Sequence, residues 1–278
     1  MSLIWGTKIM TIIRNTEVQN PSNPTWEISG NLLVRCIEAE GNVIVPEGIT
    51  EIGDNAFFRC DEIVSIELPE TVSYIGNSAF KYCDNAVCIT MPKEIKVMGA
   101  EVFQYCWKLK ELILPEGVTS IGETMLEGCT NLERLVIPNS VSRVPRTALS
   151  TCRKLRHIEL DMKKLEILPY SARNYAVLGY ISANTYGTSD SKDEQQCIVD
   201  EYIRNHNRSF FNIALSSDSK AAVNYIIANE LLKDDLIDIF IDESTSMNRG
   251  EITAMLLTYK NRLGLVGKEA KEVWDPFA

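Results

Sequence analysis

The sequence predicts an α/β repeat protein, in which a solenoid of 23-residue coils precedes an α-helical module. Two observations predict this architecture. Proline and cysteine each return every 23 residues over the middle of the chain, whereas the last third shows apolar residues at helical spacing. The recurring residues are Pro46, Pro69, Pro92, Pro115, Pro138, Cys60, Cys83, Cys106, Cys129 and Cys152.

The other positions of each unit also return in step. The copy from Pro115 to Ile137 holds an apolar column, an Ile-Gly pair, the bulky Leu126 and then Cys129, and it ends in an alternation that is typical of a short strand. One such coil cannot bury its apolar side chains alone, so neighbouring coils must stack and share a core. A period of 20 to 29 residues predicts a right-handed leucine-rich-repeat solenoid.

The repeats resemble one known family, the BspA-like, or treponemal-type, leucine-rich repeats of bacteria. The family pattern L-x-x-I-x-L-P-x-x-V-x-x-I-G-x-x-x-F-x-x-C is matched from Leu109 to Cys129, with Leu126 at the Phe position. The resemblance covers about residues 26–184. It implies an interaction surface, often on a cell-surface protein, and therefore binding rather than catalysis.

Residues 1–42 are expected to form an N-terminal segment and a hairpin cap. Residues 9–13 suit an edge strand, and the Asn- and Pro-rich stretch 20–24 breaks it. Two short strands around a Ser-Gly-Asn turn are predicted within residues 26–34. We expect Trp26 to seal the open end of the core, because an uncapped stack exposes apolar surface.

Residues 43–184 are expected to form the solenoid. Each strand is predicted to join one parallel sheet on the concave side, and each Phe-x-x-Cys segment is predicted to form a helical or 3₁₀ turn opposite. Leu178 and Ile181 fall at repeat positions of a sixth copy. The spacing therefore predicts a degenerate closing coil over residues 161–184, since terminal repeats are atypical.

The remaining chain is predicted to be a linker, residues 185–191, and a helical module, residues 192–278. Helices are expected over 192–206, 219–231, 234–244 and 248–262. Predicted N-caps are Ser191 with Glu194 three residues on, Ser217 or Asp218, and Asn248. Residues 221–232 and 251–261 resemble ankyrin-type hairpins, and residues 268–278 are expected to form a loose tail.

Composition restricts the partners. A net charge of −10 and a pI near 4.9 argue against nucleic acid and against anionic membranes. No apolar run reaches the length of a membrane span. The first residues lack the features of a secretory leader. We therefore expect a cytoplasmic protein as the sequence is written, or a cell-surface or secreted protein if a leader has been removed.

The cysteines and histidines indicate no chemistry. Five of the eight cysteines share one repeat position and lack C-x-x-C spacing, so we interpret them as buried small apolar residues. Cys36, Cys88 and Cys197 lie off this column and are expected to be more accessible. His157 and His206 have no spaced partner and are expected to face solvent. No catalytic motif occurs, so we expect neither an enzyme nor a cofactor or metal site.

The outward positions of the strands are the main candidate site. One row contains Ser65, Cys88, Glu111, Arg134 and His157, and the next contains Glu67, Thr90, Ile113, Val136 and Glu159. Ile113 and Val136 should lie side by side, rimmed by charge, which is how a protein-recognition patch looks. The predicted partner-binding residues are Glu111, Ile113, Arg134, Val136, His157 and Glu159. The alternative is that β-branched residues simply suit a strand.

A second candidate is the aromatic turn patch, Tyr82, Tyr105 and Trp107, with Phe58 and Tyr74 nearby. Tyr82 and Tyr105 are one coil apart, so they can stack. Aromatic platforms bind glycans and peptides, and glycan or cell-surface binding is therefore the rival function. The alternative is packing over the coil edges. A third interpretation makes the helical module the functional part.

Overall fold

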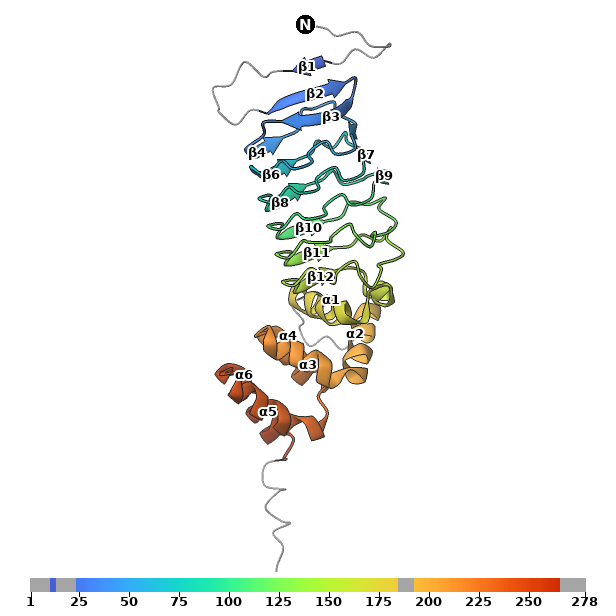
Figure 1. The fold of residues 1–278 in the computed structure, drawn as a ribbon. Coiled ribbons are helices and arrows are strands. Elements are labelled where there is room, and N and C mark those ends of the chain that lie inside the picture. The colour runs from blue at the N-terminus through green and yellow to red at the C-terminus, as the bar shows by residue number, and fades with distance from the viewer. Residues whose placement is uncertain (1–10, 14–23, 185–192, 266–278) are drawn as a thin grey trace, which may run out of the picture. The chain divides into compact units, whose positions relative to one another are not determined.

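The structure, a computed structural model, describes residues 11–13, 24–184 and 193–265. The chain divides into two compact units, which meet in sequence between Ala176 and Val177. The first is a stack of 23-residue coils and the second is built from helices, as the ribbon in Figure 1 shows. The predicted leucine-rich-repeat solenoid with a helical region is thus confirmed.

The predicted strands form a six-stranded parallel sheet, here called sheet B. Its strands follow one another in chain order along the stack (Figure 1). They are β4 (Gly41–Ile44), β6 (Ile63–Glu67), β8 (Cys88–Thr90), β10 (Glu111–Ile113), β11 (Arg134–Val136) and β12 (His157–Glu159). In the last three strands the central residue is fully buried and its two neighbours face outward, as the alternation predicts.

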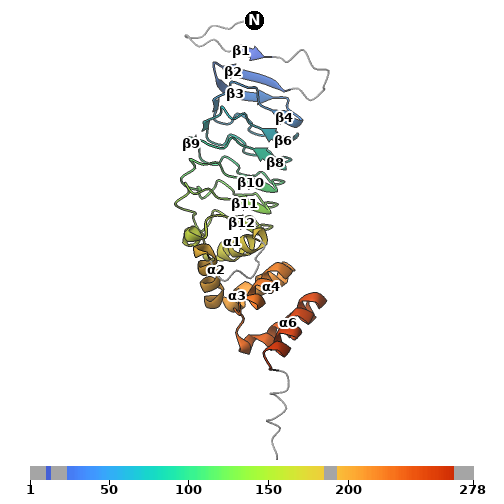
Figure 2. The same ribbon diagram turned by 180° about the vertical axis from the view of Figure 1, so that it is seen from behind.

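A second sheet corrects the prediction of a single sheet. Sheet A has the order β1 (Thr11–Ile13), β2 (Thr25–Ser29), β3 (Leu32–Ile37), β5 (Glu51–Ile52), β7 (Tyr74–Ile75) and β9 (Val97–Met98). Figure 1 places β7 and β9 on the side of the stack away from β6 and β8, and Figure 2 shows the same for β9. In the first three coils the residues just before the repeat glycine form a two-residue strand, which is too short to produce an alternating pattern.

The predicted cap is present. Strands β2 and β3 pair antiparallel around a turn in which Gly30 has φ 61°. Strand β3 also pairs in parallel with β5 of the first coil. Trp26 is 3% exposed and meets the Phe57 ring edge to face at 6.2 Å. The hairpin thus closes the first coil and covers its apolar side chains.

The Phe-x-x-Cys segments are irregular turns rather than helical ones. In the first three coils, positive φ values at two positions of the turn, such as Ser78 and Tyr82, prevent a helix from forming. The freed backbone groups bond to the next coil, as Phe80 N does to Val102 O at 3.0 Å. Inside these turns the rings of Phe57, Phe80 and Phe103 stack at centroid distances of 5.2 and 5.8 Å.

The cysteine column lies inside the turns and does more than fill space. The Cys83 thiol donates to Phe57 O at 3.2 Å, and the same carbonyl accepts the Cys60 backbone N–H of its own coil. The Cys106 and Cys129 thiols repeat this contact at 3.1 Å. All eight cysteines are free thiols. Cys36 corrects the prediction, since it is 5% exposed and extends the column into the cap.

The repeat glycines Gly76 and Gly99 lie where neighbouring coils touch. A Cβ atom built on Gly76 lies 2.5 Å from Asp54 N, and one built on Gly99 lies 2.6 Å from Asn77 N. Real Cβ atoms essentially never approach backbone so closely. Gly122 has nothing within 4 Å of this position. The requirement for glycine therefore ends before the fifth copy, which has Pro145 instead.

Residues 161–184 are helical, which corrects the predicted closing coil. They form the 3₁₀ helix η1 (Met162–Ile167), capped by the Asp161 side chain, and α1 (Tyr170–Ala183). Leu178 and Ile181 are three residues apart, a spacing that fits both the repeat and one face of a helix. Pro169 immediately before α1 suits a helix start and decides between them.

The second unit contains two helical hairpins that repeat at 30 residues. The first pairs α3 (Asn207–Ser216) with α4 (Lys220–Ala228), and the second pairs α5 (Ile237–Ser246) with α6 (Gly250–Arg262). Helix α2 (Glu194–Asn205) and the 3₁₀ helix η2 (Asp234–Leu236) precede them. The ankyrin likeness stays unconfirmed, since ankyrin repeats span about 33 residues. Among the described residues, no helix has both the length and the apolar character of a membrane span.

The predicted caps need correction. Asp193 caps α2 by accepting from Gln196 N, and Ser219 caps α4 by accepting from Ala222 N. Asp218 and Asn248 occupy left-handed positions in the two hairpin turns, φ 52° and 58°, a conformation that Asp and Asn tolerate. The predicted linker 185–191, Ser191 and the predicted tail 268–278 lie outside the described residues.

Candidate functional site

The predicted rows on sheet B are in register. Glu111 pairs with Arg134, and Arg134 pairs with His157. In the second row Ile113 pairs with Val136, and Val136 with Glu159. The outward face of β10, β11 and β12, called the sheet B face below, therefore brings all six predicted residues together.

Two apolar side chains are displayed at the centre of this face. Ile113 is 52% exposed, and its strand partner Val136 is half-buried. Both line a groove of about 360 Å³, whose lining also includes the repeat prolines Pro92, Pro115 and Pro138 and the charged residues Lys93, Glu111 and Glu116. The groove thus offers apolar surface beside charged groups.

Arg134 organises the charged row. Its Nε lies 2.8 Å from Glu159 Oε1 and its Nη2 lies 2.9 Å from Oε2, which is the bidentate fork of a guanidinium on a carboxylate. Its Nη1 bonds to the Glu111 carboxylate. The hydrogen bonds to Glu159 are the main cause that raises the pKa of Arg134, and the charges of Glu159 and Glu111 add to it. The guanidinium therefore stays charged at every working pH. The long side chain is therefore held across three strands.

A basic hollow lies at the other end of the same strands. It encloses about 580 Å³ and is lined by Glu133, Arg134, Lys154, Arg156 and His157. The Arg156 guanidinium is further held 5.8 Å from the Tyr175 ring centroid. Arg134 is already paired with Glu111 and Glu159. Lys154 and Arg156 therefore remain beside Glu133, which leaves one net positive charge for an anionic group.

The aromatic turns form a packed column, as the predicted stacking of Tyr82 on Tyr105 requires. These two rings lie 4.9 Å apart at 14°, and Phe58 meets Tyr82 edge to face at 5.7 Å. The Arg59 guanidinium lies 5.6 Å from the centroids of both Phe58 and Tyr82. The Tyr82 faces are thus occupied by neighbours, and this favours packing over ligand stacking.

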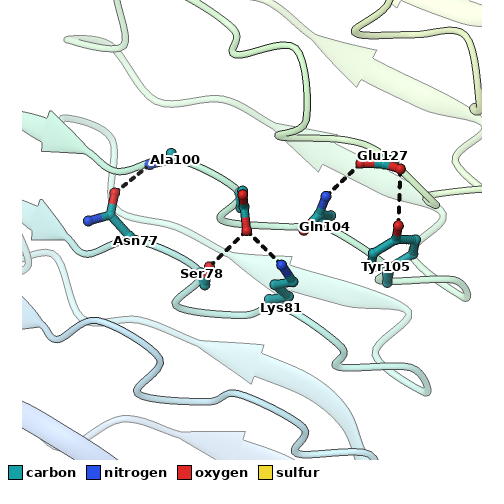
Figure 3. A network of polar contacts seen from close by, with 8 residues as sticks. Asn77, Ser78, Lys81, Ala100, Gln104, Tyr105 and Glu127 are labelled. Atoms are coloured by element: carbon teal, nitrogen blue, oxygen red, sulfur yellow. Dashed lines mark hydrogen bonds and ion pairs between the residues drawn. The ribbon is translucent and has the colours of Figure 1, made fainter.

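Polar bonds between coils hold the aromatic column in place (Figure 3). Figure 3 shows Glu127 accepting from Gln104 Nε2 at 2.6 Å and from the Tyr105 hydroxyl at 3.0 Å. The bond to Glu127 raises the pKa of Tyr105. One coil earlier, Lys81 pairs with Glu101 at 2.6 Å. The turn residues are therefore committed to joining coils.

Trp107 and Tyr74 stand apart from this column. Trp107 is 50% exposed, and its carbonyl accepts from Asn131. Tyr74 lies in β7 of sheet A. Ring contacts among the described residues include neither of them. The predicted aromatic patch is therefore a tyrosine stack and a separate tryptophan.

The remaining polar candidates are His206 and the groups that could hold a metal ion. His206 is half-buried, not solvent-facing, because its ring stacks on Tyr202 at 4.2 Å and bonds to the Tyr202 carbonyl. Over the ranges that the structure describes, His, Cys, Asp and Glu form no group of three that could hold a metal ion.

Sequence reasoning missed the basic hollow and the prolines of the groove. Lys154 and Arg156 flank Leu155 in the turn before β12, and they come together with Arg134 only when the coils stack in register. The repeated prolines were a marker of period, yet they also border the groove. Reading the residues before and after each strand as additional rows would have found both.

Comparisons with known proteins agree with the repeat geometry. Residues 27–156 match the family described as BspA type Leucine rich repeat region, in six copies. A comparison with curated proteins finds no match. The chain is 32% identical to a leucine rich cell surface protein from Faecalibacterium prausnitzii, over 53% of this chain and 41% of that one, with a TM-score of 0.48.

Two further solved structures are similar over the array. The leucine rich repeat protein of T. pallidum is 26% identical, over 48% of this chain and 64% of that chain, with a TM-score of 0.44. A leucine-rich repeat protein from Bacteroides ovatus is 22% identical, over 57% and 47% of the two chains, with a TM-score of 0.38. The chain thus spans less than two thirds of each of these proteins.

Proposed function

We propose that this chain is a non-catalytic recognition scaffold that binds another protein through the sheet B face. The match of residues 27–156 to a BspA type Leucine rich repeat region supports a binding role. The outward-facing pair Ile113 and Val136 carries this proposal. A β-branched residue at 52% exposure, over a groove lined in part by prolines, is apolar surface that the fold itself does not bury. Apolar centres with a polar rim are typical of protein interfaces.

The charged residues near Ile113 and Val136 favour an extended protein segment as the partner. The groove takes an apolar side chain beside Ile113, and the hollow at Lys154 and Arg156 takes a carboxylate. Arg134 lies between them and is held by Glu159 and Glu111, so its position is fixed before binding. We therefore expect a partner segment with an apolar residue followed or preceded by acidic ones.

A random linear-peptide display library selected on the immobilised full chain tests this function. Selected peptides should share apolar and acidic residues, and Ile113→Asp with Val136→Asp should weaken their binding at least about tenfold, or 1.4 kcal/mol. Val97→Asp is the matched control, because Val97 is a β-branched residue, 49% exposed, in β9 of sheet A. Far-UV circular dichroism checks that both variants fold. Undiminished peptide binding by a folded double variant would refute the sheet B face.

Glycan binding, an adhesin-like function, is the second candidate. The half-exposed Trp107 favours it, whereas the stacked Tyr82 and Tyr105 do not. A glycan array probed with the full chain and with Trp107→Ala separates the two functions. Glycan signals that disappear with Trp107→Ala, but survive Ile113→Asp with Val136→Asp, would favour this candidate over protein recognition.

A further inference from the structure

The cysteine column begins with two cysteines that lie close together. Cys36 lies in β3, and Cys60 lies at the end of the first turn. Their backbones belong to adjacent coils, since Cys36 N donates to Ala56 O at 2.8 Å. Cys60 Sγ also lies 3.9 Å from Cys36 O.

The rest of the column is arranged differently. Cys83, Cys106 and Cys129 point their thiols at a phenylalanine carbonyl of the preceding coil and are fully buried. The first coil has a hairpin before it instead of another repeat, so the carbonyl that the Cys60 thiol meets is that of Cys36. The pair is thus a product of the junction between cap and array.

The junction is also open to solvent. A hollow of about 570 Å³ lies over it, and its lining includes Arg35, Cys36, Phe58, Arg59 and Cys60. Cys60 is half-buried, whereas Cys36 is 5% exposed. A small molecule in the hollow therefore reaches Cys60 first. The hollow also carries the charges of Arg35 and Arg59 and of the carboxylates Glu38, Asp61 and Glu62.

Electrostatics assign the same order to the two thiols. The hydrogen bond from Cys36 lowers the pKa of Cys60, and the charge of Arg35 acts in the same direction. The same bond, followed by burial, raises the pKa of Cys36. Burial and the charge of Asp61 oppose this lowering. Cys60 is therefore the more acidic thiol of the pair.

We propose that Cys36 and Cys60 are a reactive dithiol, which a small-molecule disulfide oxidises to a disulfide bond between the cap and the first coil. The Cys60 thiolate attacks one sulfur of the reagent, so a mixed disulfide forms and one thiolate leaves. Cys36 then loses its proton and attacks the Cys60 sulfur, and the second reagent thiolate leaves. The two protein thiols lose two electrons and two protons, and the reagent disulfide becomes two thiols.

Glutathione disulfide is the probe, and the protein is the full chain with Cys88→Ser and Cys197→Ser, which removes the exposed thiols. Intact mass should fall by about 2 Da, the two thiol hydrogens, and a peptide map should join Cys36 to Cys60. The unmodified chain is the positive control, because Cys88 should take up glutathione. An unchanged mass in the Cys88→Ser, Cys197→Ser chain, while Cys88 reacts in the control, would overturn the proposal.

Two single variants in the same background separate the roles. Cys36→Ser should retain one glutathione on Cys60, because no thiol remains to displace it. Cys60→Ser should take up none, because Cys36 is buried. Circular dichroism verifies folding, and Cys36→Ala replaces Cys36→Ser if serine unfolds the cap. A folded Cys36 variant without glutathione on Cys60, or a Cys60 variant that reacts at Cys36, would contradict this order. The peptide-binding test is independent of these outcomes, since the sheet B face lies on other coils.

Discussion

Arg134 holds the Glu159 carboxylate with two nitrogens, at 2.8 and 2.9 Å, although its strand partner is His157. The contact is diagonal, from the first outward row to the second. It ties the charged row to the row that displays Ile113 and Val136. The guanidinium therefore sets the spacing between the two halves of the proposed recognition face.

This ion pair should position side chains rather than stabilise the fold. Both side chains are about one third exposed, 36% and 33%, and solvent screens pairs of this kind. We expect a double-mutant cycle of Arg134→Ala and Glu159→Gln, followed by urea unfolding, to give a coupling of about 0.2–1 kcal/mol. A coupling above about 3 kcal/mol, the range of buried pairs, would contradict this prediction.

Gly99→Ala should destabilise the array, because its Cβ would lie 2.6 Å from Asn77 N and from the Gly76 carbonyl carbon. Backbone cannot move aside as a flexible side chain can, so a loss of about 1–3 kcal/mol is expected in urea unfolding. Gly122→Ala, at the same repeat position with open space around it, is the control and should change stability little. Equal losses in both variants would show that coil contact is not the cause.

Phe80→Ala should cost about 3–5 kcal/mol of unfolding free energy, as large-to-small changes in a core do. Its ring is fully buried between Phe57 and Phe103, so neighbours on both sides lose contact. Phe58→Ala removes a phenylalanine side chain next to Phe57, and Phe58 is 39% exposed. Its loss should be clearly smaller, and thermal unfolding followed by circular dichroism compares the two. Similar melting temperatures would argue against a continuous phenylalanine core.

Alkaline pH should weaken the array through its buried thiols. Burial raises the pKa of Cys152 from 9.0 to about 12, so the folded protein binds this proton more tightly than the unfolded chain. This contribution to stability is complete below about pH 9 and is lost as the pH rises towards 12. Cys152→Ala removes the group, and its urea midpoint should therefore fall less between about pH 8 and pH 10.5. Parallel midpoints for the two proteins would disprove the role of this thiol.

The repeat made much of the first unit predictable. A constant 23-residue period fixes which residues become strand neighbours, so the pairing of Ile113 with Val136 followed from counting alone. The Ser-Gly-Asn turn likewise located the hairpin that Trp26 closes. Where one coil resembles the next, residues that are one period apart in the sequence lie next to each other in adjacent coils.

The misses have physical causes. Strands of two residues, such as Glu51–Ile52, are shorter than any periodic pattern, so sheet A left no signal. Leu178 and Ile181 suited the repeat as well as a helix. Helix α3 was missed although its buried residues Phe210, Phe211, Ala214 and Leu215 have the spacing of one helix face. The basic hollow joins residues of different coils that share no row, and only the folded stack assembles it.

The thiol-to-carbonyl contacts have a consequence for how such a chain can change in length. Cys106 supplies the donor for Phe80, and Cys129 supplies it for Phe103, so every coil brings the partner that its predecessor needs. A duplicated stretch of 23 residues would therefore enter the array with its internal bonding already complete. Gain or loss of whole coils preserves this bonding, whereas an insertion of any other size breaks it. The number of coils in the array can therefore change, whereas the length of each coil stays at 23 residues.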